Sequence, residues 1–212
     1  MKFTEAIQQY SEEPLTKQLM LGMLKEYSRP YDKINELVKQ DVLRLVKRGI
    51  YIPGSKLKLA GPEPFLLANH ILGPSYISLE TALSYWGLIP EHVYEISSVT
   101  VCNSKTYTTS AGRFSYTHLT SPYYSFGIQQ LQLTKRQTVL IASPEKALCD
   151  KIITTSGLLF RSSKQVMAFL LEDLRIDRAA LHNLNHQEIS QWIIDAPKKD
   201  SLNTLVKTLQ QL

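Results

Sequence analysis

The sequence predicts an α+β protein of two domains, and three observations support this. Hydrophobic residues recur at helical spacing in three short segments that open the chain, within residues 3–41. β-prone runs fill most of residues 93–142, and helical periodicity returns from residue 143 onward. With 212 residues, 43% of them hydrophobic, the chain is long enough to bury two cores.

The opening helices are expected near residues 3–10, 15–24 and 30–41. Pro30 suits the first turn of the third helix, where its missing N–H costs nothing. Ile34, Leu37 and Val38 would share one face of this helix and pack inward. The opposite face would then be open to solvent or to a partner.

A hairpin is expected directly after these helices. Residues 42–46 and 50–53 are β-prone, and Lys47-Arg48-Gly49 lies between them as a turn signal. Three helices and a hairpin predict a winged helix-turn-helix over residues 1–60, whose hairpin would be the wing. Its tip would carry Lys47 and Arg48.

Residues 61–212 are predicted to form a mixed α+β domain with a mainly antiparallel sheet and a helical C-terminus. Two helices are expected within residues 63–90, one of them capped by Ser78 and stopped at Gly87. The expected strands are 96–102, 105–108, 113–118, 123–133 and 138–142. The expected later helices are 146–155, 163–174, 177–183, 187–194 and 201–212.

The positive charge is concentrated in one segment. The whole chain carries +5, and residues 30–60 hold seven basic against three acidic groups, a local net charge of +4. Such an excess predicts contact with a polyanion, although a merely solvated basic face would look the same.

The candidate DNA contacts lie on the third helix and the wing. They are Lys33, Asn35, Lys39, Gln40, Lys47 and Arg48. Asn and Gln side chains can pair with adenine and Lys with guanine, whereas wing-tip cations suit phosphates. Asp32 and Glu36 share the outward face of this helix and would repel phosphate unless the neighbouring lysines pair with them.

The sequence has no recognisable catalytic, cofactor or metal motif, so we expect a non-enzyme without a cofactor. His182 and His186 have the spacing of a helical zinc pair, but no third ligand follows, and structural or surface roles are favoured. Cys149 has acidic neighbours, which raise a thiol pKa, and is expected to be a buried helix residue. Without a leader or an apolar span, a cytoplasmic protein with no membrane partner is expected.

Five segments together resemble AbiEi-type antitoxins, the transcriptional-regulator halves of type IV toxin–antitoxin (abortive-infection) systems. They are RPYDKINEL (29–37), VKRGIY (46–51), YISLETAL (76–83), GLIPE (87–91) and SPEKALCD (143–150). The resemblance runs in order over residues 14–150. It implies a repressor that binds its operator through the winged helix and antagonises a nucleotidyltransferase-like toxin without a stable complex.

Two other functions remain open at this point. The basic winged helix could bind an acidic protein partner or the toxin itself, or the chain could be an enzyme acting on nucleic acid or nucleotides. The aromatic residues between Tyr107 and Phe126 could stack bases, but alternating aromatics such as Phe114 and Tyr116 are favoured as sheet core.

Overall fold

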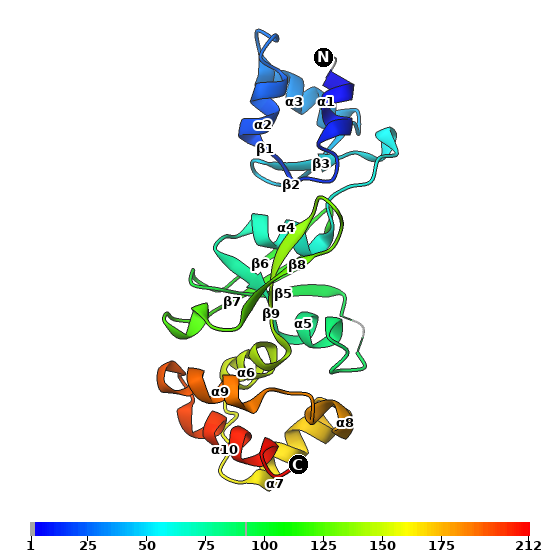
Figure 1. Cartoon of the computed structure of the whole chain (residues 1–212). Coiled ribbons are helices and arrows are strands. Elements are labelled where there is room, and N and C mark those ends of the chain that lie inside the picture. The colour runs from blue at the N-terminus through cyan, green and yellow to red at the C-terminus, as the bar shows by residue number, and fades with distance from the viewer. Residues whose placement is uncertain (1–2, 92) are drawn as a thin grey trace.

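The computed structural model describes residues 3–91 and 93–212. The molecule is elongated, with the N-terminus at one end, a sheet in the middle and a helical C-terminal end (Figure 1). We call residues 3–57 the N-terminal unit and residues 64–212 the C-terminal unit. Residues 58–63, which join them, have no regular secondary structure, and the predicted boundary at residue 60 falls there.

The N-terminal unit has three helices and a small antiparallel sheet. Its elements are α1 (Phe3–Gln9), β1 (Leu15–Thr16), α2 (Lys17–Met23), α3 (Pro30–Lys39), β2 (Leu43–Lys47), β3 (Ile50–Pro53) and the 3₁₀ turn η1 (Ser55–Leu57), with strand order β1-β3-β2. The Thr16 hydroxyl accepts a hydrogen bond from the Leu19 N–H and so caps α2. Gly49 adopts a φ of +88° in the β2–β3 turn, a conformation that glycine tolerates best.

The three helices and the hairpin lie where the sequence predicts them, and β1 is the addition. This strand is only two residues long, so it leaves no alternating pattern in the sequence. As expected, Ile34 and Leu37 of α3 are buried, and they pack in the core of this unit with Ile7, Leu15, Met20, Leu24 and Leu43.

The C-terminal unit contains a six-stranded sheet of order β6-β7-β5-β4-β9-β8. The strands are β4 (Ser75–Ile77), β5 (Glu95–Thr100), β6 (Lys105–Thr109), β7 (Gly112–His118), β8 (Ile128–Gln132) and β9 (Thr138–Ala142). As expected, most of the strand pairs are antiparallel, namely β4–β5, β6–β7 and β8–β9, whereas β4–β9 and β5–β7 are parallel. In these described residues the sheet is mixed.

Two further differences concern strand boundaries. All three residues of β4 are buried, so this strand has no polar–apolar alternation to reveal it. The segment expected as one strand over 123–133 begins instead as the 3₁₀ turn η2 (Tyr123–Ser125), and β8 starts only after Gly127, whose φ is +61°.

Helices cover the sheet and form the C-terminal end. They are α4 (Pro64–Ile71), α5 (Leu79–Tyr85), α6 (Pro144–Thr154), α7 (Ser163–Ala168), continued by a π-helical turn to Asp173, α8 (Arg178–Leu181), α9 (His186–Trp192) and α10 (Lys199–Leu209). The helices expected after residue 143 are confirmed. Throughout the described ranges, no helix combines the length and the apolar character needed to cross a bilayer.

The two units are joined by more than the connecting segment. Val46 and Ile52 of the hairpin are buried in the large core of the C-terminal unit, not in their own. The Ser110 hydroxyl donates to the Leu45 carbonyl at 2.9 Å. The hairpin is therefore packed against the C-terminal unit, while α3 lies on the other side of the small sheet (Figure 1).

A second set of contacts, which we call the interdomain latch, joins residues 9–12 to the β8–β9 turn. The Arg136 guanidinium donates to the Gln9 carbonyl at 3.2 Å. The carboxylate of Glu12 accepts longer hydrogen bonds, of 3.4 and 3.5 Å, from Thr134 and Gln137. The latch is polar and contributes less than the shared apolar core.

The side chain of Lys198, which is far from α6 in the sequence, binds backbone carbonyls at the C-terminal end of that helix. Its ammonium donates to the carbonyls of Ile152, Thr155 and Leu158, at 2.9, 2.6 and 2.9 Å. Ile152 lies in the last turn of α6 and Thr155 is its C-cap, where a helix leaves carbonyls without intrahelical partners, whereas Leu158 belongs to the loop that follows. A cation at this position also suits the helix dipole.

We expect Lys198→Met to lower the free energy of unfolding by about 1–3 kcal/mol, because it leaves carbonyl acceptors without a donor. Urea denaturation followed by circular dichroism measures this. Lys199→Met is the matched control, since Lys199 is exposed at the start of α10 and the change should stay within about 0.5 kcal/mol. Equal losses for both variants would contradict the capping role.

Candidate nucleic-acid interface

The exposed face of α3 carries most of the residues that the sequence nominates. Asn35, Lys39 and Gln40 are exposed and Lys33 is half-buried, while Ile34 and Leu37 anchor the opposite face. The helix therefore presents a polar surface on the side opposite its buried residues.

Glu36 organises part of this surface. Its carboxylate lies 2.9 Å from the Lys33 ammonium and also accepts a 2.9 Å hydrogen bond from the Gln40 amide. These contacts raise the pKa of Lys33 and lower that of Glu36, in both cases chiefly through their mutual hydrogen bond. Lys33 thus offsets the negative charge of Glu36, and both Lys33 and Gln40 are engaged within the helix.

Asn35 and Lys39 differ from these neighbours. Within the described part of the chain, neither side chain has a hydrogen-bonding or charged partner, and both are exposed on α3. They are the α3 side chains most available to a ligand.

The side chains of Lys47 and Arg48 lie in different environments. Arg48 is exposed in the β2–β3 turn, as expected for a wing tip. The Lys47 ammonium instead donates to the Ile71 carbonyl of α4 at 2.6 Å and lies 4.9 Å from the centroid of the Tyr107 ring. The β2–β3 register shifts between Leu45 and Lys47, and this irregularity accompanies the turn of Lys47 toward the C-terminal unit.

Lys17 is a basic residue of this surface that the sequence reasoning missed. Its N–H donates to the Gly49 carbonyl at 2.8 Å, which places the start of α2 beside the hairpin turn. Its exposed ammonium lies 4.8 Å from the centroid of the Tyr31 ring at the start of α3. The signal that could have found it is Thr16, whose capping position puts Lys17 in the first turn of α2.

The start of α2, the β2–β3 turn and the first turn of α3 therefore meet in one place. We call Lys17 and Arg48, together with Asn35 and Lys39 of α3, the basic face. It carries three cations, and the exposed acids Asp32 and Glu36 of α3 are not part of this set.

A second polar cluster lies inside the C-terminal unit. Asp150 of α6 accepts hydrogen bonds from the Tyr76 and Ser78 hydroxyls, at 2.9 and 2.7 Å, and pairs with the Lys146 ammonium at 2.8 Å. The side chains of Lys146 and Asp150 are fully buried. Lys146 also donates to the Tyr123 carbonyl and lies 3.4 Å from the centroid of the Tyr123 ring.

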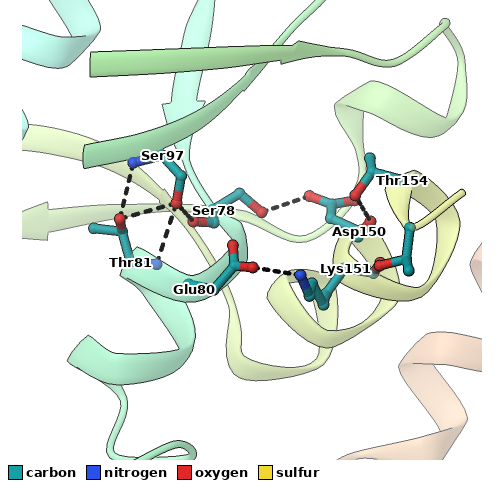
Figure 2. A network of polar contacts seen from close by, with 8 residues as sticks. Ser78, Glu80, Thr81, Ser97, Asp150, Lys151 and Thr154 are labelled. Atoms are coloured by element: carbon teal, nitrogen blue, oxygen red, sulfur yellow. Dashed lines mark hydrogen bonds and ion pairs between the residues drawn. The ribbon is translucent and has the colours of Figure 1, made fainter. Parts of the chain in front are cut away.

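Figure 2 shows how this cluster continues toward α5 and β5. Ser97 and Thr81 exchange hydrogen bonds with one another, and Ser97 also donates to the Ser78 carbonyl. Lys151 pairs with Glu80 at the exposed edge. The network therefore ties β4, α5, β5 and α6 together through buried polar atoms.

Burial governs the protonation of this cluster. Burial lowers the pKa of Lys146, and the adjacent Asp150 carboxylate opposes that shift. Burial raises the pKa of Tyr76 and of Tyr123, and Asp150 adds to both shifts. The sequence segment SPEKALCD predicts the helix and its Ser143 cap, which accepts from the Lys146 N–H, but not the ion pair inside it.

Two sequence expectations about buried groups are confirmed. Cys149 is fully buried in α6, and burial, then Asp150, raises its pKa. Phe114 and Tyr116 are buried in the sheet core, while His118 at the end of β7 is exposed. The aromatic run therefore serves mainly as core.

No protein-family model matches the chain, and no curated protein matches it significantly.

Proposed function

We propose that the N-terminal unit is a winged helix that binds duplex DNA through the basic face. The observation that carries this proposal is that Lys17 lies beside both the β2–β3 turn, which carries Arg48, and Tyr31 in the first turn of α3. The order of helices and strands, with a hairpin after the third helix, supports it.

The roles divide according to chemistry. Lys17 and Arg48 hold phosphates beside the first turn of α3, because both cations are exposed at element ends that lie next to that turn. Asn35 and Lys39 face the groove, where an amide can pair with adenine and an ammonium with guanine. Lys33 and Gln40 position Glu36 so that its charge is screened from the phosphates.

The biological role proposed is that of a transcriptional repressor of its own operon and the antitoxin of a type IV system. Its functional partner is a nucleotidyltransferase-like toxin. The resemblance of the five segments supports this part. Tyr76, Ser78, Lys146 and Asp150 of the buried network fall in two of those segments, and they connect β4 to α6 in the C-terminal unit.

Asn35→Ala tests base readout. We expect it to reduce discrimination between the DNA upstream of the gene and random duplex by about 1–3 kcal/mol, the value of a good bidentate contact. Fluorescence anisotropy titrations of the full chain on both duplexes measure this. Equal losses on both duplexes would exclude base readout by Asn35.

Lys47→Met and Arg48→Ala test which hairpin cation holds a phosphate. Arg48→Ala should reduce the slope of log affinity against log salt by about 0.9, one phosphate contact, whereas Lys47→Met should leave that slope unchanged. The physical reason is that the Lys47 ammonium is bound to the Ile71 carbonyl. A shallow slope for the wild-type chain would instead favour an acidic protein partner.

A further inference from the structure

A cavity of about 360 Å³ lies in the C-terminal unit, between the start of α4, α5, the start of β5 and the β8–β9 hairpin. Its apolar lining consists of Pro64, Phe65, Tyr85, Val93, Ile96 and Leu133. The Phe65 and Tyr85 rings meet edge to face with their centroids 5.8 Å apart. This volume and lining fall in the range of small-molecule sites, which span about 300–1,000 Å³.

The cavity has few polar groups, and they differ in whether they are free to bind a ligand. The Thr81 hydroxyl donates to the Glu95 carbonyl at 3.0 Å, and the Ser84 hydroxyl donates to the Glu91 carbonyl at 2.8 Å. Glu63 is exposed, and among the described residues its carboxylate has no hydrogen-bonding or charged partner. A single carboxylate at the edge of an aromatic cavity favours a cationic group on the ligand.

We propose that this cavity binds a small, flat aromatic ligand that carries an ammonium group. The ring lies against Phe65 and Tyr85, and the ammonium pairs with Glu63. Nothing in this assignment depends on the N-terminal unit binding DNA.

The same cavity is connected to the interdomain latch. The Glu63 N–H donates to the Gln137 side-chain carbonyl at 2.7 Å, and the other end of that amide is the group that contacts Glu12. Leu133, which lines the cavity, donates through its N–H to the Gln137 carbonyl at 2.9 Å. A ligand that orders Glu63 and Leu133 therefore orders the β8–β9 turn and the latch with it.

The test uses the full chain with two probes of similar shape and opposite charge, tryptamine and indole-3-propionate. Titration calorimetry should give tryptamine a Kd of about 1 mM or tighter, and indole-3-propionate an affinity at least about 10-fold weaker. Glu63→Gln keeps the backbone N–H and should remove this preference. Glu172→Gln, at an exposed glutamate outside the cavity, should keep it.

Hydrogen exchange tests the connection to the latch. Saturating tryptamine should slow exchange of amides in residues 133–137 by at least about 3-fold. The proposal is overturned if the wild-type chain binds neither probe, binds both equally, or keeps its preference for tryptamine in Glu63→Gln. Binding with unchanged exchange at residues 133–137 would overturn the connection between cavity and latch.

Discussion

Lys146→Met is expected to lower the free energy of unfolding by about 3–5 kcal/mol, the usual cost of removing one partner from a buried ion pair. The side chains of Lys146 and Asp150 are fully buried, so the remaining carboxylate would lose its counter-ion where water cannot replace it. The Tyr76 and Ser78 hydroxyls would still donate to that carboxylate, but they carry no net charge. Urea denaturation measured by far-ultraviolet circular dichroism gives the change.

Two further variants test whether the loss comes from the unpaired buried charge. Lys146→Met combined with Asp150→Asn removes both charges while keeping an acceptor for the hydroxyls, and should recover part of the loss. Lys151→Met, next to the cluster on α6, breaks only the partly exposed pair with Glu80 and should cost about 1 kcal/mol or less. A Lys146→Met variant that loses no more stability than Lys151→Met would show that the buried pair contributes little.

The double variant Lys17→Glu/Arg48→Glu is expected to weaken binding to duplex DNA by on the order of 100-fold at about 0.1 M salt, since two attractive phosphate contacts become repulsive. The fold should survive, because both residues are exposed and a glutamate in the first turn of α2 suits the helix dipole. Anisotropy titrations over a salt series measure the effect.

The matched control is Lys164→Glu/Lys207→Glu, which makes the same change of net charge at exposed positions of α7 and α10. If it weakens binding as much as the first double variant, overall charge explains the effect and the basic face does not. The first double variant should also still rescue cells from the proposed toxin. Loss of rescue in a normally folded variant would place the basic face in toxin neutralisation as well.

The sequence predicts what depends on local periodicity. The inward face of α3, the Ser143 cap of α6 and the strand 138–142 follow from helical spacing, capping chemistry and β-prone composition, and the structure confirms them. Each of these features depends on residues that are close together in the sequence. Hydrophobic spacing and capping motifs can be recognised over that range.

Features that depend on distant segments are missed for the same reason. The sequence predicts Lys47 in an exposed turn, but it is the last residue of β2, and only the proximity of Ile71 and Tyr107 directs its ammonium inward. Lys146 sits in the first turns of a helix, where a lysine is usually exposed, and its burial depends on Tyr76 and Tyr123. Lys17 becomes part of the basic face only because β1 pairs with β3.

The burial of Val46 and Ile52 in the core of the C-terminal unit has a consequence for how the molecule unfolds. Because one hairpin belongs to both units, neither can lose its structure without exposing apolar surface of the other, and unfolding should proceed as one cooperative step. A protease that cut the chain at residues 58–63 would leave a fragment with an exposed apolar strand face. We expect such a fragment to aggregate or to be degraded, so the basic face and the aromatic cavity should be lost together after such a cut.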